Sequence, residues 1–380
     1  MALNSVLAKV TDRIVKRSEK TRNTYLERME NMRKDGPQRA HLSCGNQAHA
    51  YAPMGDDKAA LAEGTNGNLG IITAYNDMLS AHQPFQFYPD IIKETARAAG
   101  GTAQVAAGVP AMCDGITQGQ TGMELSLFSR DAIAMSTGIG LSHNVFDSTA
   151  TIMGKGLEEY TKDPKLIDDE LIWTDGVKTS LNDKIVASAA KPFQATGGLS
   201  DLKGNLGSGV MKVSAVAEER RQITAPVRVF HDQHSVLAAF RNDEFTSDLI
   251  VVVRYQGPKA NGMPELHGLT PCLTVLQDRG IKVALVSDGR MSGASGKVPA
   301  AIHVSPEALD NGPLAFLQDG DIVTVDAING TLDAQDASIF NREITHPDMS
   351  DNKFGLGREL FDIFRNNVGP AQSGATIFNF

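Results

Sequence analysis

Two glycine-rich stretches in the last third of the chain carry the residue types best suited to chemistry. One runs from Gly257 to His267 and holds Glu265, and the other runs from Ser287 to Lys297 and holds Ser292. Glycines in such loops leave backbone amides free to face a ligand. A carboxylate, a hydroxyl and free amides together predict a site for an oxyanion or for an oxygen bound to a metal ion.

Secondary structure must bring these two stretches together for them to form one site. Each follows a β-branched apolar run, at residues 248–255 and 281–286, so each is predicted to leave the carboxyl end of a strand. Between them, residues 266–278 have helical apolar spacing, and Gly280 suits a helix stop. A strand–loop–helix–strand–loop unit of this kind places both stretches at the same edge of one sheet.

The residues of these loops have competing interpretations. Arg290 and Lys297 flank Ser292 and are candidates to bind an anionic substrate. The surrounding residues lack the Gly-x-Ser-x-Gly spacing of a nucleophile elbow, so Ser292 is either catalytic or a turn residue. Glu265 is either a ligand or the start of the following helix.

Further candidates lie in predicted loops of the first half. Cys113 and Asp114 follow a short strand, where Asp114 suits a hard cation and Cys113 is either a soft ligand or a small buried residue. Asn76, Asp77 and His82 follow an earlier strand. They either position a polar substrate or cap the next helix.

Two other patterns are weak evidence for function. His231 and His234 have a spacing compatible with metal binding, but two histidines alone do not define a site. The segment 204–209 is rich in glycine but matches neither nucleotide-binding fingerprint. A nucleotide-dependent enzyme is therefore disfavoured.

The organisation of the chain predicts two domains of the α/β class. Residues 1–150 alternate strand and helix from Asn68 onward, which predicts a parallel-sheet α/β domain. Residues 151–185 are polar and lack periodicity, so they are expected to be a linker. Residues 186–380 have short β-rich runs, including a predicted hairpin whose Asn329-Gly330 pair favours a type I′ turn.

Composition narrows the class of protein further. The net charge of -9 over 380 residues gives no reason to expect nucleic acid or a membrane as partner. The first 34 residues mix basic and acidic side chains, as a solvated helix does and a targeting peptide does not. Three widely spaced cysteines form no disulfide framework, so we expect a cytoplasmic protein.

Taken together, these segments resemble the dihydroxy-acid and phosphogluconate dehydratase family. The motifs that carry the resemblance run in order along nearly the whole chain. They are Ser43-Cys-Gly-Asn, Ala74-Tyr-Asn-Asp-Met-Leu-Ser-Ala-His, Val109-Pro-Ala-Met-Cys-Asp-Gly, Glu124-Leu-Ser-Leu-Phe-Ser-Arg-Asp, Leu141-Ser-His-Asn-Val-Phe-Asp, Gly204-Asn-Leu-Gly and the two glycine-rich stretches.

The resemblance implies a fold and a reaction. The fold is an N-terminal α/β domain, here incomplete, followed by a β-rich swivelling β/β/α domain. The reaction is dehydration of a sugar-acid phosphate, 6-phospho-D-gluconate of the Entner–Doudoroff pathway, to its 2-dehydro-3-deoxy product. Members of the family are typically homodimers and use an iron–sulfur cluster of the 4Fe-4S type with Mg²⁺ or Mn²⁺.

By the same resemblance, Asp114 and Glu265 match cation ligands, Ser292 matches the proton-abstracting serine, and Cys113 is the cysteine nearest the expected site. One departure affects these roles. The family carries a middle stretch with Cys-Asp-Lys and Thr-Cys motifs, and neither motif occurs here. We therefore expect a shortened chain with impaired activity, or alternatively an inactive remnant that dimerises or binds sugar-acid phosphates.

Overall fold

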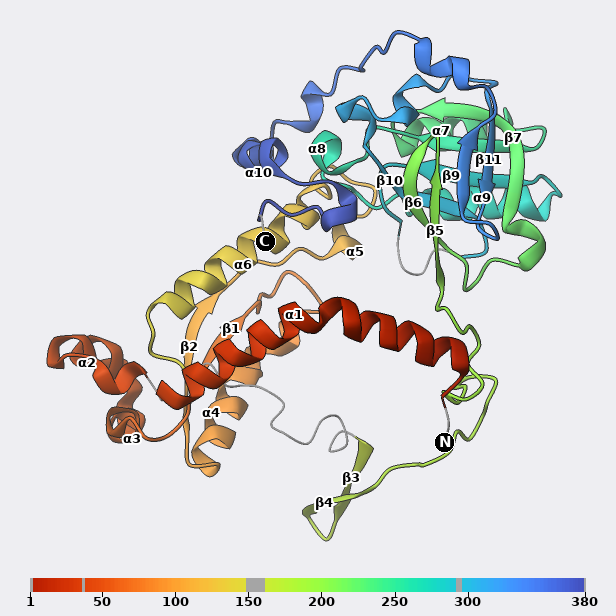
Figure 1. Cartoon of the computed structure of the whole chain (residues 1–380). Coiled ribbons are helices and arrows are strands. Elements are labelled where there is room, and N and C mark those ends of the chain that lie inside the picture. The colour runs from red at the N-terminus through yellow and green to blue at the C-terminus, as the bar shows by residue number, and fades with distance from the viewer. Residues whose placement is uncertain (1–2, 36–37, 148–160, 292–295, 379–380) are drawn as a thin grey trace. The chain divides into compact units, whose positions relative to one another are not determined.

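A computed structural model describes residues 3–35, 38–147, 161–291 and 296–378. The chain forms two compact units (Figure 1). The first comprises residues 1–73, 85–108 and 137–197, and the second comprises residues 74–84, 109–136 and 198–380. No helix in the described part of the chain is long and apolar enough to cross a membrane.

The first unit contains a small parallel sheet. Strand β1 pairs in parallel with β2, and helix α4 provides the crossover between them. The close approach of the chain before β1 to the chain before β2 favours glycine at position 101, because a Cβ atom there would lie 2.8 Å from the Gly67 carbonyl oxygen. The elements are α1 (Ser5–Asp35), α2 (Cys44–Tyr51), α3 (Lys58–Glu63), β1 (Asn68–Thr73), α4 (Tyr88–Ala98), β2 (Thr102–Gly108), β3 (Lys162–Ile167) and β4 (Glu170–Asp175).

A buried ion pair between Arg39 and Asp147 joins two distant segments of the first unit. The Arg39 side chain is 1% exposed, and its Nη1 donates to the Asp147 carboxylate at 2.7 Å. Asp147 also accepts from the backbone amide of Asn68 at the start of β1. Removing either charge would leave the other without its counter-charge in a largely buried place, which is destabilising.

The stretch expected to be a linker contains the hairpin β3–β4. Its two strands pair from Lys162 with Asp175 to Ile167 with Glu170, so only Asp168 and Asp169 form the loop. Both have positive φ, 52° and 62°, as a type I′ turn requires. Aspartate tolerates this conformation better than most residues, but the sequence pattern there did not predict a hairpin.

The second unit is built around a closed barrel of eight strands in the order β10-β6-β5-β12-β11-β7-β8-β9 (Figure 1). Strands β7, β8 and β9 are parallel, and the remaining pairs are mostly antiparallel. The strands are β5 (Leu199–Gly204), β6 (Gly207–Lys212), β7 (Gln222–Phe230), β8 (Leu249–Val253), β9 (Val283–Ser287), β10 (Ala300–Ser305), β11 (Ile322–Asp326) and β12 (Thr331–Ala334). The helices are α5 (Asp114–Thr117), the first part of α6 (Leu125–Ser142), α7 (Gln233–Arg241), α8 (Pro258–Asn261), α9 (Leu269–Asp278) and α10 (Asp362–Asn367).

The apolar run of β8 is continuous because both of its faces are buried. Ile250 and Val252 belong to the barrel interior, whereas Val251 and Val253 pack with α7 and α9 on the outside. Alternate residues of a strand point to opposite faces, so a strand buried on both sides has no polar positions. The expected strand–loop–helix–strand order is confirmed, and Gly280 follows α9 with φ 90°.

The predicted hairpin near Asn329 is present as β11–β12, but its turn differs from the expectation. Asp326 pairs with Thr331, so the loop has four residues instead of the two of a type I′ hairpin. The Asp326 carboxylate accepts from the backbone amides of Ile328 and Asn329, at 2.8 and 2.9 Å. These hydrogen bonds stabilise the longer loop.

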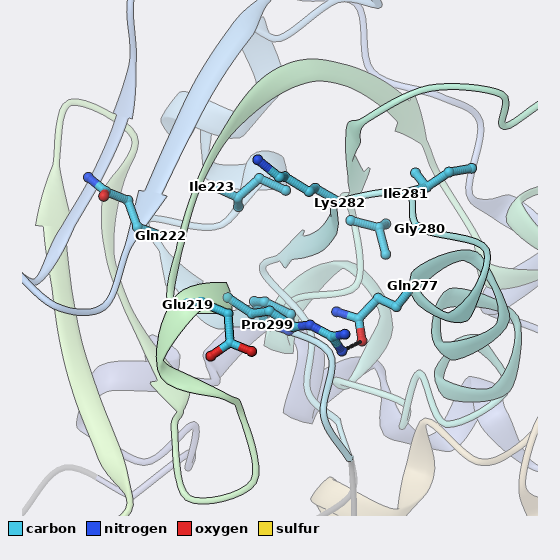
Figure 2. A pocket seen from close by; sticks show the side chains of 10 residues that line it. Glu219, Gln222, Ile223, Gln277, Gly280, Ile281, Lys282 and Pro299 are labelled. Carbon is cyan, nitrogen blue, oxygen red and sulfur yellow. Dashed lines mark hydrogen bonds between the residues drawn. The ribbon is translucent and has the colours of Figure 1, made fainter.

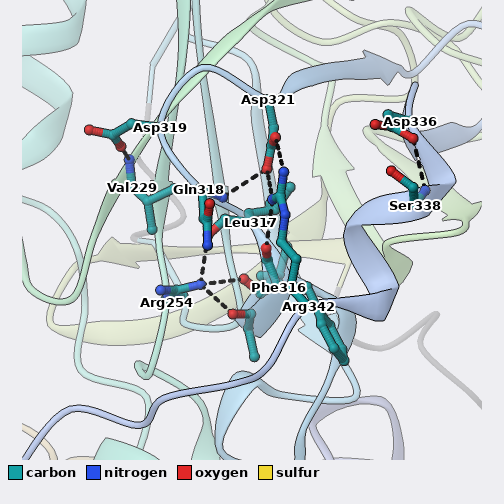
Figure 3. A network of polar contacts seen from close by, with 12 residues as sticks. Val229, Arg254, Phe316, Leu317, Gln318, Asp319, Asp321, Asp336, Ser338 and Arg342 are labelled. Carbon is teal, nitrogen blue, oxygen red and sulfur yellow. Dashed lines mark hydrogen bonds and ion pairs between the residues drawn. The ribbon is translucent and has the colours of Figure 1, made fainter.

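Two arginines fasten the segment 313–321 to the barrel (Figure 3). Arg254 Nη1 donates to the carbonyl oxygens of Leu314, Ala315 and Leu317 at 2.7–3.0 Å. Arg342 forms a two-point contact with Asp321, at 2.5 and 2.9 Å. Arg254 directly follows β8, so this network also fixes the start of the first glycine-rich loop.

Candidate active site

The two glycine-rich stretches meet in the second unit, at the carboxyl ends of β8 and β9. Glu265 and Arg290 form a parallel β-bridge, and the Leu266 amide donates to the Arg290 carbonyl oxygen at 3.0 Å. The Arg290 side chain closes the contact by donating to Glu265 Oε1 at 3.0 Å and to the Met263 carbonyl oxygen at 2.6 Å. The expected approach of the two loops is therefore present.

Residues in an unusual backbone conformation surround this junction. Tyr255, Met263 and His303 have φ of 61°, 51° and 57°, and none of them is glycine. Such conformations cost on the order of 1–3 kcal/mol each and persist where the surrounding structure enforces them. Their position beside the paired loops marks this region as a functional candidate.

Two buried carboxylates hold the first loop in place. Asp288 accepts from the backbone amides of Tyr255, Gln256 and Ala308 at 2.9–3.1 Å. Glu307 accepts from the amides of Lys259 and Ala260 at 2.9 and 3.3 Å. Burial raises the pKa of Asp288 to about 6 and that of Glu307 to about 7.

Gly257 shows how closely the loop approaches Glu307. A Cβ atom at position 257 would lie 1.8 Å from Glu307 Oε2 and 2.7 Å from Glu307 Cβ, so either the Glu307 side chain or the loop would have to move. The glycine at this point of the loop is therefore required by the carboxylate beneath it. Sequence reasoning missed Glu307, because it lies far from the loop in the chain and belongs to no local pattern.

His303 is a second residue that sequence reasoning missed. It lies on β10, and its amide donates to the Gly289 carbonyl oxygen at 2.9 Å. Burial lowers the pKa of His303, and the positive charge of Arg290 lowers it further. Both effects favour the neutral imidazole. Its position within an ordinary apolar strand gave no signal in the sequence.

The other predicted residues of the second glycine-rich stretch have different surroundings. Lys297 donates to Asp278 at 2.8 Å, and both side chains are largely exposed. Ser292 lies outside the described residues. The proposed roles of Ser292, Arg290 and Lys297 therefore stay predictions.

The predicted residues of the first loop hold their own turn. Asn76 Oδ1 accepts from the Leu79 amide at 2.9 Å, and His82 Nδ1 lies 3.1 Å from the Ala74 carbonyl oxygen. Asp77 accepts from the Tyr75 hydroxyl at 2.7 Å, which raises the pKa of Tyr75. Asn76 therefore stabilises a turn at Leu79 and does not cap the next helix, which begins at Gln83, and substrate binding by Asn76, Asp77 and His82 stays a prediction.

The described histidines 231 and 234 do not pair with each other. His231 Nε2 accepts from Arg254 at 3.3 Å, and its ring packs edge-on against Tyr255. Burial and the Arg254 guanidinium lower the pKa of His231. The histidine at position 234 is exposed at the start of α7.

The thiols of this chain do not fit a 4Fe-4S cluster. Cys272 is 4% exposed on α9, donates to the Leu269 carbonyl oxygen at 3.1 Å, and burial raises its pKa. Only Cys44, which is exposed, and Cys113, which is half-buried before α5, remain. A cluster of this kind ordinarily takes four thiolates, and one that keeps an iron open as a Lewis acid would still take three, more than the two accessible thiols of this chain.

The described residues do not complete a divalent-cation site either. No group of three or more His, Cys, Asp or Glu side chains lies close enough to hold a metal ion in the part of the chain that the structure describes. Asp114 begins α5, and its side chain is outside the described atoms. Glu265 is described, and Arg290 already neutralises its charge.

A separate cavity lies at the opposite ends of the parallel strands (Figure 2). Its volume is about 200 Å³, and Gln222 and Val283, at the starts of β7 and β9, line it. Its buried amide, Gln277, accepts from Arg220 at 3.0 Å. None of the catalytic, substrate-binding or metal-ligating residues predicted from the sequence lines this cavity.

Comparison with known proteins matches both halves of the chain to one family. Residues 66–154 match the dihydroxy-acid/6-phosphogluconate dehydratase N-terminal model, and residues 184–375 match the C-terminal model. The chain is 34% identical over 603 residues to phosphogluconate dehydratase of Rhizobium meliloti, covering 99% of this chain and 100% of that protein. It is 35% identical over 593 residues to phosphogluconate dehydratase of Pseudomonas aeruginosa, covering 97% and 98%.

A more distant relative matches less of the chain. Dihydroxy-acid dehydratase of Acetivibrio thermocellus is 33% identical over 237 residues, covering 60% of this chain and 39% of that protein. The alignment with the Rhizobium protein spans 603 positions, whereas this chain has 380 residues, so at least 223 positions (603 less 380) face a gap here. By these matches to both family models and to full-length relatives, the chain belongs to the dihydroxy-acid/6-phosphogluconate dehydratase family.

Proposed function

We propose that this chain is a hydro-lyase for 6-phospho-D-gluconate, with a weakened catalytic step. The reaction removes a proton from C2 and the hydroxyl from C3 as water, and the resulting enol becomes the 2-keto acid. The names of the relatives that align along the whole chain support this substrate. The observation that carries the proposal is the junction of the two glycine-rich loops through Glu265 and Arg290.

The chain's own residues supply positioning and charge in this proposal. Arg290 places a positive charge in the loop that contains Ser292, and such a charge favours the alkoxide that a serine base requires. The buried carboxylates of Asp288 and Glu307 accept from backbone amides at and before the first loop, so the backbone beside Glu265 keeps a fixed position. A fixed position of this kind lets a side chain meet a substrate without rearrangement.

Cofactor use follows the family in this proposal. An iron–sulfur cluster and Mg²⁺ or Mn²⁺ would supply Lewis acidity for loss of the hydroxyl and for stabilising the charge on the acid. The described thiols and carboxylates do not provide a complete ligand set for either group. We therefore infer that the shortened chain turns over slowly or requires the missing segment from another polypeptide.

An anaerobic assay tests the proposal. The purified chain is incubated with iron, sulfide, Mg²⁺ and 6-phosphogluconate, and the 2-keto product is measured beside the Pseudomonas relative. We expect product formation far below that of the relative but above a Glu265→Gln, Arg290→Met double variant. Turnover equal to that of the relative would contradict the impairment, and a rate no higher than that of the double variant would contradict the activity.

The shortage of cluster thiols favours a second candidate function, a non-catalytic protein that binds sugar-acid phosphates. Anaerobic reconstitution separates the two candidates, because only the enzyme predicts a visible absorbance band from a cluster. Calorimetry with 6-phosphogluconate then measures binding whether or not turnover occurs. Binding without an absorbance band and without product would favour the second candidate.

The partners and location belong to the same proposal. We infer a homodimer in the cytoplasm that binds a small sugar-acid phosphate and neither nucleic acid nor membrane. The acidic net charge of -9 supports the exclusion of nucleic acid. Sedimentation of the purified chain measures the oligomeric state.

A further inference from the structure

A polar cavity of about 190 Å³ adjoins the candidate active site within the second unit. Its walls come from the segment between α5 and α6, the start of α7, the first glycine-rich loop and the C-terminal segment. Pro264, which directly precedes Glu265, lines it. The cavity therefore reaches the residue next to Glu265 in the chain, while Glu265 itself does not line it.

The charged groups of this cavity compensate one another. Glu124 and Arg358 form an ion pair, and their side chains are 6% and 5% exposed. The Asp232 carboxylate caps α7 by accepting from the amide and the hydroxyl of Ser235, at 2.8 and 2.6 Å. The described acids and the arginine of this cavity already have partners within the protein. The cavity is therefore not suited to a phosphate, which binds best to surplus positive charge.

The rest of the polar lining consists of amide side chains, one hydroxyl group and one imidazole. They belong to Gln120, Thr121, Gln233, His234, Gln256, Asn261 and Asn352. Gln256 Nε2 donates to the His231 carbonyl oxygen at 2.6 Å, and Asn261 Nδ2 donates to Gln256 Oε1 at 3.2 Å, so two of these amides are held in fixed orientation. Amides and hydroxyls both donate and accept, which matches the hydroxyl groups of a polyol.

We propose that this cavity binds the hydroxylated carbon chain of the sugar acid. The substrate class in this inference rests on the proposed function. The inference adds the place where the uncharged, hydroxylated part of that substrate binds. The cavity selects for hydroxyl groups, and the phosphate lies outside it. A site built to hydrogen-bond hydroxyl groups discriminates strongly against an analogue that lacks them.

Calorimetry on the full chain tests this site with two probes. D-gluconate carries the hydroxyl groups without a phosphate, and hexanoate has the same carbon count and carboxylate without hydroxyl groups. We expect D-gluconate to bind and hexanoate to bind at least tenfold more weakly, in line with about tenfold for each 1.4 kcal/mol lost. Equal affinity for the two probes, or no binding of gluconate, would overturn the site.

Variants localise the binding to the cavity. Gln120→Met and Thr121→Val remove polar atoms at nearly constant size from positions that are exposed, so both should fold. Each is expected to weaken gluconate binding about three- to tenfold, the effect of one lost hydrogen bond. The matched controls Gln335→Met and Thr246→Val change exposed residues that do not line the cavity, and they should leave affinity unchanged.

The outcome separates this site from the proposed function. Unchanged affinity for 6-phosphogluconate in both cavity variants would overturn the site while leaving dehydration standing. Weakened gluconate binding in those variants, without any measurable dehydration, would support the site and count against the activity instead.

Discussion

The carboxylate of Glu265 lies 3.0 Å from the Arg290 guanidinium, and the same two residues are also bridged through their backbones. The pair therefore joins the two glycine-rich loops and neutralises the charge of a predicted metal ligand. Its side chains are only 14% and 22% exposed, so water screens the interaction less than it screens a surface pair.

A double-mutant cycle should detect this coupling. Glu265→Gln and Arg290→Met are expected to destabilise the fold non-additively, with a coupling free energy on the order of 1–2 kcal/mol. The free energy of unfolding in urea measures each corner of the cycle. The exposed pair of Lys297 and Asp278 is the control, and its coupling should be below about 1 kcal/mol. Additive effects at Glu265 and Arg290 would contradict the structural role of the pair.

The buried carboxylates predict a loss of stability as the pH rises. The pKa of Glu307 is raised from 4.5 to about 7 and that of Asp288 from 3.8 to about 6, so the folded protein holds protons that the unfolded chain releases. Their stabilising contribution is complete below about pH 4 and is lost as the pH rises through 6 and 7. Glu307 alone should account for about 2–3 kcal/mol between pH 5 and 8.

Urea unfolding at pH 5 and pH 8 measures this dependence. Glu307→Gln should remove its share of the slope, because a glutamine does not titrate. Glu359→Gln, at an exposed position, is the matched control and should retain the slope of the parent chain. An unchanged slope in the Glu307 variant would show that this carboxyl is not the titrating group.

Gly257→Ala tests the close approach between the first loop and Glu307. The added methyl group would lie 1.8 Å from Glu307 Oε2, so the loop or the Glu307 side chain must move and stability should fall by about 1–3 kcal/mol. The same displacement should weaken binding of 6-phosphogluconate. Gly138→Ala is the control, because a Cβ there meets nothing within 4 Å, and a helical alanine should be neutral or stabilising. Equal stability of the two variants would contradict the predicted clash.

Local patterns predicted the parts of the fold that depend on neighbouring residues. The continuous apolar run of β8 and the glycine that ends α9 are examples, because burial and helix termination leave a periodic signal. The turn chemistry was less reliable. Asn329-Gly330 lies in a four-residue loop, whereas the two-residue turn formed at Asp168-Asp169, where no pattern suggested it.

Interactions between distant residues could not be predicted from these patterns. The two loops were expected at one sheet edge, and the Glu265–Arg290 bridge fulfils that expectation. Glu307 and His303 were missed because their importance comes from what the closed barrel places beside them. A single sequence shows neither the Glu307 carboxylate beneath Gly257 nor the order in which the barrel strands pair.

The accessibility of the three cysteines can be tested directly. Burial raises the pKa of the Cys272 thiol, and the thiolate is the reactive form, so Cys272 should not react with a disulfide reagent in the folded protein. Cys44 is exposed and Cys113 is half-buried, so native labelling should reach no more than two thiols per chain, and all three should react in denaturant.

Cys272→Ala distinguishes the sites in that experiment. It should leave the native count unchanged and lower the denatured count by one, whereas Cys44→Ala should lower both counts. If Cys272 instead reacted in the folded chain as fast as Cys44, it would be accessible enough to serve as a ligand. The conclusion that this chain has too few accessible thiols for an iron–sulfur cluster would then lose its structural support, because three thiolates suffice for a cluster that keeps one iron open as a Lewis acid.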